Sequence, residues 1–365
     1  MGASGQSGPR ALVGLLLAAA LVACAAPARP AASGEAAPAG EAAAGAAGAA
    51  AAPARQAASA APTAAPAAAP EHTTLLVSTT SSVFLPHKLA EVKGLFLAQG
   101  LDTEVVVTSS NVEAAAVATG DVDFSGQLPA AIRQRLAGLP MVGTAAVVGH
   151  STRYLVALPQ YTSIGDLRGK TLTGSSPAGS DTQVLRRVLS FYGLDPDQDV
   201  TILNAGDVPA RWAAIQSGHA EGGLFAGGDV LKAQELGLRP VVRVADVLDM
   251  PENGLAVSER KLAEQPEQVK RALRALLDAV TFVRSQPDEA ARVLADWVGI
   301  DERAARAQID ALIPALSPDL TVSDAELQAV IDAERAAAGI EREYSPADVT
   351  DFTLLNEVLR ERGLR

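Results

Sequence analysis

The chain has 365 residues, of which 48% are hydrophobic and 4% aromatic, and its formal net charge at pH 7 is −12. This acidity, without any run of Lys or Arg, argues against a nucleic acid partner. Cys24 is the only cysteine, so disulfides and a cysteine-based zinc site are excluded and the folded part depends on its hydrophobic core.

The N-terminal segment has the features of an export signal. Arg10 precedes an apolar run over residues 11–23 that is too short to span a bilayer as a mature helix. Leu21-Val22-Ala23-Cys24 resembles the cleavage box of bacterial lipoproteins, in which the cysteine takes a lipid and becomes the first mature residue. We therefore expect a signal peptide at 1–23 and lipidation of Cys24, with a secretory signal and an incidental cysteine as the alternative.

Residues 25–72 have the composition of a tether. They contain 27 alanines and seven prolines and show no hydrophobic periodicity. Such a segment has nothing to bury and its prolines prevent one long helix. We expect a disordered linker over 24–72.

Residues 75–107 predict a strand, a loop, a helix and a second strand. The apolar run 75–77 is typical of a strand buried on both faces of a parallel sheet, and the hydroxyl-rich residues 79–82 end it. Pro86 suits the first turn of a helix, Gly100 ends that helix, and the next strand occupies 104–107.

The rest of the chain alternates between helix and strand signals and then becomes helical, which predicts an α/β fold with mainly parallel sheets flanked by helices. The 293 residues after the tether exceed one compact core, so we expect two lobes: 73–158, then 159–250, then 251–365 returning to the first lobe. Further strands are predicted at 122–124, 141–148, 154–158, 171–173, 200–203, 220–225, 241–244 and 254–257. Further helices are predicted at 111–119, 130–137, 182–192, 209–217, 267–285, 288–298, 302–312, 323–338 and 348–362.

Short motifs in a fixed order carry a family resemblance. They are AEVKGLF at 90–96, GLD at 100–102, GDVDF at 120–124, DLRGK at 166–170, GS at 179–180, GLDP at 193–196 and IQSG at 215–218. Over about residues 74–260 the chain resembles the nitrate, sulfonate, taurine and thiamine-precursor substrate-binding proteins of ABC importers. The resemblance implies a type II periplasmic-binding-protein fold with a ligand cleft between the lobes. It also implies an exported, monomeric protein, held on the membrane by its lipid, that delivers a small solute to an ABC permease.

Ligands of such sheets collect beyond the carboxyl ends of the strands, so four loops and one strand end supply the candidate site. The first three loops offer hydroxyl groups, an aromatic wall, and a glycine beside an amide, and their candidate residues are Thr80, Ser81, Ser82, Phe84, Ser110, Gly126 and Gln127. The fourth loop lies before a helix whose N-terminal N–H groups favour anions, and it contributes Ser175, Ser176, Gly179 and Ser180. Phe225 and Gly227 come from a glycine-rich wall at 222–229, where the chain departs from the family's Asp-Ala-Pro pattern.

Asp181 has two interpretations. As a helix cap it is ordinary, whereas a carboxylate facing the cleft repels an anion and attracts an amine. The cap is the favoured interpretation. No arginine lies in the four loops, although Arg153 and Arg211 can point inward, and the solute stays open among sulfonates, nitrate-like anions, pyrimidines and aromatic acids. Closure is expected at crossings near 158–162 and 246–251.

An enzyme is the competing class. The four histidines show no paired spacing, no GxSxG motif occurs, and the mature domain has no cysteine, so we expect neither catalytic residues, nor a metal, nor a cofactor. His87, at a helix start, is predicted to be an exposed helical residue rather than a base. A relative of thiamine-pyrimidine synthases would need a cysteine- and histidine-rich site, which this chain lacks. A ligand-sensing receptor is a further alternative that the sequence does not separate from transport.

Overall fold

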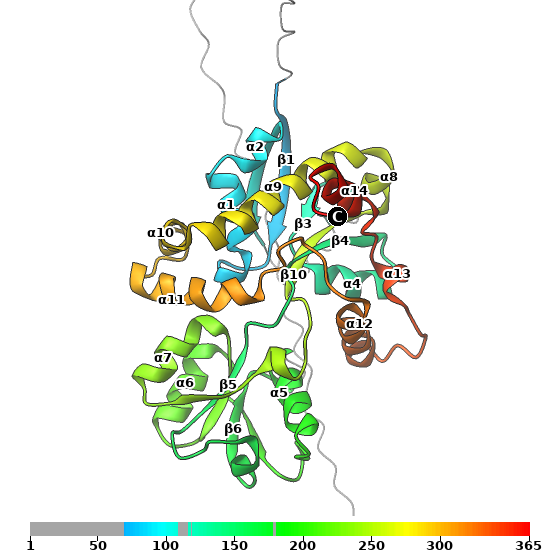
Figure 1. The fold of residues 1–365 in the computed structure, drawn as a ribbon. Coiled ribbons are helices and arrows are strands. Elements are labelled where there is room, and N and C mark those ends of the chain that lie inside the picture. The colour runs from blue at the N-terminus through cyan, green and yellow to red at the C-terminus, as the bar shows by residue number, and fades with distance from the viewer. Residues whose placement is uncertain (1–68, 109–115, 118, 178–179) are drawn as a thin grey trace, which may run out of the picture. The chain divides into compact units, whose positions relative to one another are not determined.

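The computed structural model describes residues 69–108, 116–117, 119–177 and 180–365, which form two lobes, each built on a five-stranded sheet (Figure 1). The first sheet has the order β2-β1-β3-β10-β4 and the second the order β7-β6-β8-β5-β9. The strands of the first are β1 (Glu71–Val77), β2 (Leu101–Val107), β3 (Phe124–Ser125), β4 (Met141–Val148) and β10 (Asn253–Ser258). Those of the second are β5 (Tyr154–Ala157), β6 (Thr171–Gly174), β7 (Thr201–Asn204), β8 (Gly222–Phe225) and β9 (Arg239–Arg243).

Each sheet is parallel apart from one strand. β10 runs antiparallel to β3 and β4, and β5 runs antiparallel to β8 and β9. In both sheets the antiparallel strand is the one that the chain uses on entering the lobe from the other. The expected return of residues 254–257 to the first lobe is confirmed by the pairing of β10.

Two boundaries differ from expectation. β5 belongs to the second sheet, so the first crossing occupies residues 149–153 and precedes the expected 158–162. The expected boundary after residue 158 was wrong because β4 and β5 are both short apolar runs, which do not show the sheet that each joins. The folded part also begins before residue 73, since Glu71 of β1 already pairs with Leu101.

Helices cover both faces of each sheet (Figure 1). Those of the first lobe are α1 (Leu85–Val92), α2 (Leu95–Ala98), α4 (Leu128–Leu136), α8 (Glu259–Glu264), α9 (Pro266–Ser285), α10 (Pro287–Val298), α11 (Glu302–Leu312), α12 (Asp324–Ala338), α13 (Pro346–Val349) and α14 (Thr353–Glu361). Those of the second are α5 (Ser180–Phe191), α6 (Val208–Gln216) and α7 (Val230–Glu235). The 3₁₀ helices are η1 (Ser82–Phe84), η2 (Ile164–Leu167), η3 (Gly227–Asp229), η4 (Val244–Asp246) and η5 (Ile313–Ala315).

The helix pattern agrees with the sequence except at short or interrupted helices. The helix expected at 348–362 is divided into α13 and α14, because Thr350 leaves the helix to bridge Gly143 of β4. A capping box, formed by Ser323 and Glu326, begins α12. Most of the helix expected at 111–119 lies outside the described residues. Among the described helices, none is both long and apolar enough to cross a membrane.

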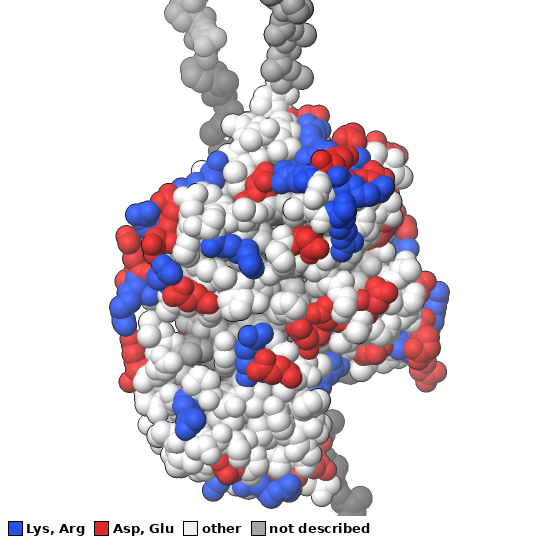
Figure 2. Space-filling view, viewed as in Figure 1, with Lys and Arg blue, Asp and Glu red and all other residues white. Residues whose placement is uncertain are grey.

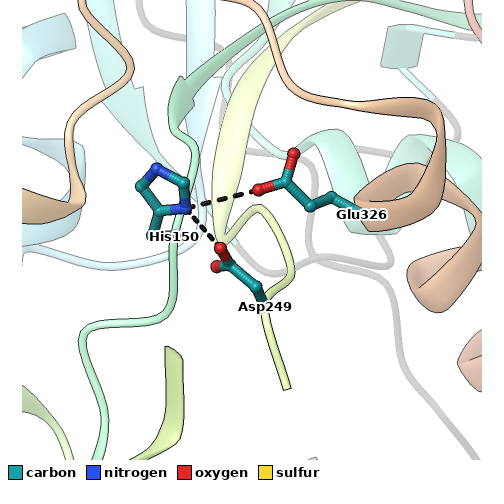
Figure 3. A group of neighbouring side chains, drawn as sticks. All are labelled: His150, Asp249 and Glu326. Atoms are coloured by element: carbon teal, nitrogen blue, oxygen red, sulfur yellow. Dashed lines mark hydrogen bonds and ion pairs between the residues drawn. The ribbon is translucent and has the colours of Figure 1, made fainter. Parts of the chain in front are cut away.

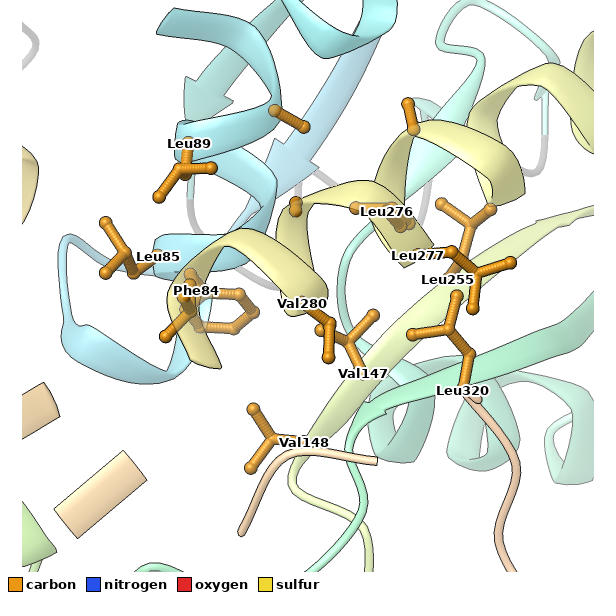
Figure 4. Close-up of a cluster of buried hydrophobic side chains, with 14 of the residues drawn as sticks. Phe84, Leu85, Leu89, Val147, Val148, Leu255, Leu276, Leu277, Val280 and Leu320 are labelled. Carbon is orange, nitrogen blue, oxygen red and sulfur yellow. The ribbon is translucent and has the colours of Figure 1, made fainter. Parts of the chain in front are cut away.

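The alternation of side chains along β1 explains the two-sided burial of the first sheet. Leu75 and Val77 point into a core with α1 and α9, while Leu76 points to the opposite face, with residues of α4. Figure 4 shows Leu276 and Val280 of α9 in this core, four residues apart and so on one face of the helix. Burying each such side chain contributes about 1.5–3 kcal/mol.

The second sheet repeats this arrangement. Leu155 of β5 and Leu224 of β8 pack with α5, whereas their neighbours Val156 and Phe225 pack with Trp212 of α6. Both sheets are therefore buried on both faces, and their carboxyl edges remain as the places where loops can present polar groups.

Candidate ligand-binding site at the junction of the lobes

The loop after β1 is held against the start of β10. Asn253 is fully buried, donates from Nδ2 to the Val83 carbonyl, and accepts at Oδ1 from the Val148 N–H at 3.0 Å. Of the residues predicted here, Thr80 is exposed, Ser82 is half-buried and Phe84 is 5% exposed in the first core. The Ser81 hydroxyl oxygen is buried and has no hydrogen-bond partner among the described residues, which makes it a candidate for a contact with a ligand.

His87 corrects one expectation. Its ring is 0% exposed rather than exposed, and Nε2 lies 2.8 Å from the Gly254 carbonyl of β10. Burial lowers the pKa of His87 to about 4, so the neutral ring donates this hydrogen bond. The histidine joins α1 to β10, the antiparallel strand of the first sheet.

Gly126 lies where β3 meets the same histidine. A Cβ at Gly126 would lie 3.0 Å from Val77 Cγ1 and 3.4 Å from His87 Nε2. Its N–H donates to the Leu76 carbonyl at 2.8 Å, and its carbonyl accepts from the Gly254 N–H at 3.0 Å. Close packing therefore explains this glycine. The neighbouring Gln127 is half-buried, and its N–H donates to Ser125 Oγ at 3.1 Å.

The loop after β6 forms the second lobe's contribution. The Ser175 N–H donates to Thr182 Oγ1 at 3.0 Å, which fixes the loop against the first turn of α5, and Ser176 is exposed. Ser180 is the first residue of α5. Two predicted residues, Ser110 and Gly179, lie outside the described residues.

Asp181 bonds to two arginines, which neither interpretation of the sequence anticipated. Its Oδ1 accepts from Arg153 Nε and its Oδ2 from Arg211 Nη2, both at 3.0 Å. Arg211 comes from α6 and its side chain is only 4% exposed, while Arg153 comes from the first crossing. The favoured cap is thus replaced by an ionic role, because two cations distant in the sequence converge on this carboxylate.

Glu252, in the second crossing, completes the network. Its Oε1 accepts from Arg153 Nη1 at 2.6 Å and from the Thr152 N–H at 3.0 Å, and its side chain is 10% exposed. The Glu252 carboxylate is the main cause that raises the pKa of Arg153 above its ordinary value. Arg153 therefore joins both crossings to α5 of the second lobe, and the two arginines and two carboxylates balance in charge.

The predicted wall residues pack inside the protein. Phe225 is 1% exposed and its ring stacks on Trp212, with centroids 3.7 Å apart and planes inclined by 12°. A Cβ at Gly227 would lie 2.7 Å from the Thr152 carbonyl oxygen and 3.1 Å from Ala311 Cβ. This glycine therefore lets α11 of the first lobe approach η3 of the second, and α11 also contacts η1.

Asp123, in the family motif at 120–124, has a structural role. Asp123 accepts from the Thr74 N–H at 2.9 Å and from Lys261 Nζ at 2.6 Å, so it holds the residues before β3 against β1 and α8. Figure 2 shows acidic and basic side chains intermixed over the first lobe, and a largely uncharged face on the second. A hollow of about 440 Å³, lined by residues such as Val322, Phe352 and Arg365, lies at the C-terminal helices.

Sequence reasoning missed the central residues of the junction: Glu252, Asn253 and the ionic pairing of Arg153 with Asp181. No local spacing reports them, because these contacts join residues 28 and about 100 positions apart in the chain. The one available signal was the position of Arg153 and Glu252 beside the strand ends.

Comparison with known proteins places this geometry in a family. Residues 81–290 match the family described as NMT1/THI5 like. The riboflavin-binding protein RibY of Chloroflexus aurantiacus is 30% identical over 237 residues, which cover 60% of this chain and 64% of RibY, so the chain spans less than two thirds of that relative.

Solved structures share the fold. The periplasmic sulfonate-binding protein SsuA of Methylobacillus flagellatus KT aligns with a TM-score of 0.66 at 17% identity, covering 81% of this chain and 96% of SsuA. The periplasmic nitrate-binding protein NrtA of Synechocystis PCC 6803 aligns with a TM-score of 0.61 at 14% identity, covering 82% and 91%. The resemblance drawn from the short motifs is confirmed. Since the matched residues exceed half of the chain and run from the first loop into α10, the chain belongs to the NMT1/THI5-like family and has the two-lobed fold of periplasmic binding proteins.

Proposed function

We propose that this protein is an extracytoplasmic solute-binding protein that captures a small organic solute between its lobes and delivers it to an ABC permease. The observation that supports this most directly is the position of Arg153. It lies in one crossing and bonds to the other crossing through Glu252 and to α5 through Asp181. A solute that contacts both carboxyl edges would change the relative free energies of open and closed arrangements around this network.

The charge balance of the network bears on the solute. Asp181 and Glu252 already occupy the guanidinium groups of Arg153 and Arg211, and Arg211 Nη1 donates to the Leu224 carbonyl at 2.8 Å. Because the two carboxylates already balance the charge of both arginines, a small inorganic anion would gain little net attraction here unless it displaced a carboxylate. We therefore favour an acceptor-rich, neutral or weakly anionic solute, such as a pyrimidine or a larger fused heteroaromatic ring, over nitrate. Sulfonates and aromatic acids remain the competing classes.

A binding screen tests the proposal. The tag-free chain would be melted with riboflavin, pyrimidines, aromatic acids, alkanesulfonates, taurine and nitrate. A ligand at about 100 times its dissociation constant stabilises by about 2.7 kcal/mol, which raises the melting temperature by about 2 °C or more in a domain of this size. We expect hits among the heteroaromatic solutes.

Ser81→Ala supplies the site control. Because the Ser81 hydroxyl has no partner among the described residues, its removal should leave unliganded melting unchanged while weakening the hit about tenfold. Ser190→Ala, an exposed position at the far end of α5, should change neither. The binding function is refuted if no solute shifts melting and the purified protein instead turns a substrate over.

We also propose that the protein is exported and anchored through a lipid on Cys24, a residue outside the described part of the chain. The apolar run before Cys24 and the cleavage box support this. Cys24→Ala should leave the protein uncleaved or released from the membrane fraction. Normal processing and membrane retention of that variant would contradict lipidation but not solute binding.

A further inference from the structure

A second group of polar side chains lies beside the crossings, separate from the Arg153 network. His150 follows β4 in the first crossing, Asp249 lies in the second, and Glu326 lies in the first turn of α12 (Figure 3). His150 Nδ1 is 2.7 Å from Asp249 Oδ2 and 3.4 Å from Glu326 Oε1. All three ligand atoms lie within 4.8 Å of one another, although the residues are 77 or more positions apart in the sequence.

The carboxylate oxygens of this group that no other donor uses are suited to bind a cation. Asp249 Oδ1 is buried and has no hydrogen-bond partner among the described residues. Glu326 uses Oε2 for its capping box, where it accepts from the Ser323 N–H at 2.5 Å, and so leaves Oε1 directed at the histidine. One imidazole thus faces two carboxylates, and even an imidazolium ring supplies only one positive charge against their two negative charges.

The distances fit a small ion with nitrogen and oxygen ligands. A tetrahedral Zn²⁺ at about 2.1 Å from each ligand separates those ligands by about 3.4 Å. The His150 to Glu326 distance already has this value. The 2.7 Å between His150 Nδ1 and Asp249 Oδ2 is the length of a hydrogen bond. This distance would increase by about 0.7 Å when the ion replaces the proton between the two atoms.

The ligand types and exposure select the class of ion. Imidazole favours Zn²⁺ and its neighbours in the transition series, whereas Mg²⁺ and Ca²⁺ prefer all-oxygen sites. The side chains of His150 and Asp249 are 37% and 35% exposed, so an ion can enter from solvent and keep water in its fourth position.

We propose that His150, Asp249 and Glu326 bind a divalent transition-metal ion such as Zn²⁺ that ties the two crossings to α12. The ion restrains the segments whose backbone must turn when the lobes open or close, 149–153 and 247–252. Metal and solute binding are then coupled through the crossings, since each changes the freedom of the same backbone.

Metal binding is measured first, and it needs no knowledge of the solute. The full chain without an affinity tag is dialysed against Zn²⁺, and Co²⁺ is used as a spectroscopic probe for visible absorption. We expect one ion per chain and at least tenfold weaker binding in His150→Ala and Asp249→Asn. Glu326→Gln separates metal binding from helix capping best, because glutamine preserves the capping box while removing the negative charge of the ligand.

His72 supplies the matched control, since it also lies near a carboxylate, Asp102 at 3.4 Å, and that carboxylate is its single ion-pair partner found among the described residues. His72→Ala should bind Zn²⁺ as the unaltered chain does. The variants should melt like the unaltered chain in the presence of EDTA, which separates loss of the site from loss of folding.

Three results would overturn the proposal. Undiminished Zn²⁺ binding in both His150→Ala and Glu326→Gln would refute the proposed metal site. Equal affinity of the protein for Mg²⁺ and Zn²⁺ would also refute it. Zn²⁺ that binds without slowing hydrogen exchange in 149–153 and 247–252 would leave a metal site but refute the restraint of the crossings.

Discussion

Asp181→Asn tests the ionic network most directly. The substitution keeps the shape of the side chain but removes the charge that holds Arg153 Nε and Arg211 Nη2, each at 3.0 Å. A hydrogen bond to a charged group contributes about 1.5–3 kcal/mol, and asparagine retains one acceptor, so we expect the loss of about one such bond. Since the Asp181 side chain is 24% exposed, water replaces part of the contact, and about 1.5–3 kcal/mol is therefore an upper range.

Urea unfolding measures this loss in the second lobe. Trp212 is buried in that lobe, and a Trp297→Phe background removes the other tryptophan, so fluorescence reports the lobe that contains Asp181 and Arg211. The midpoint should fall while the slope stays unchanged. Thermal melting should fall by about 3–6 °C.

Asp207→Asn is the control. Asp207 caps α6 by accepting from the Ala210 N–H at 2.9 Å, and asparagine caps a helix about as well as aspartate. If Asp181→Asn unfolds at the same urea concentration as Asp207→Asn, the two arginine contacts carry no stability and Asp181 acts as a cap after all.

Three other substitutions or truncations test packing and protonation. Because burial lowers the folded-state pKa of His87 from 6.5 to about 4, the unfolded chain binds more protons between these values, and stability should fall by up to about 3 kcal/mol as pH drops from about 6.5 to about 4. His87→Gln should flatten that part of the stability profile and exposed His219→Gln should not; a slope unchanged in His87→Gln would refute the assignment. Gly227→Ala should lower the free energy of unfolding by about 1–3 kcal/mol, measured by thermal melting, since its Cβ would lie 2.7 Å from the Thr152 carbonyl oxygen. Gly165→Ala, whose Cβ would have its nearest atom at 3.7 Å, should leave the melting temperature unchanged. A chain of residues 69–365 should unfold cooperatively. A chain that starts at residue 74 should be less stable, because it loses the Glu71–Thr73 part of β1 and with it the buried hydrogen bond between the Thr73 and Thr103 hydroxyl groups at 2.8 Å. Equal stability of the two chains would contradict the assignment of residues 71–73 to β1.

The strands and longer helices were predictable because each has a period that the sequence displays. The buried α/β strands are short apolar runs such as 75–77, and the C-terminal helices keep their apolar residues on one face with visible caps such as Ser323. The choice of sheet is not a local property, so β5 was placed in the wrong lobe.

The sequence predicted which loops form the candidate site, but not the contacts that their residues make. The rule that ligands meet the carboxyl ends of strands selected the loops after β1, β3 and β6, which contact Asn253, Gly254 and Arg153 at or beside the crossings, whereas the loop with Ser110 lies outside the described residues. It did not predict that Phe225 and Gly227 are used for packing, or that Asp181 is paired with arginines. Those outcomes depend on Trp212, α11 and Arg153, which approach only after both lobes have formed.

The position of β10 has a consequence for the order of folding. β10 lies between β3 and β4 in the first sheet, yet it follows them by more than a hundred residues, whereas the strands of the second lobe form one continuous stretch from Tyr154 to Arg243. During synthesis the N-terminal part of the chain emerges first, so the second lobe can be completed while β3 and β4 still lack the strand that joins them. The first lobe must close a long loop before its central hydrogen bonds form, and it should be the slower of the two to reach its native state.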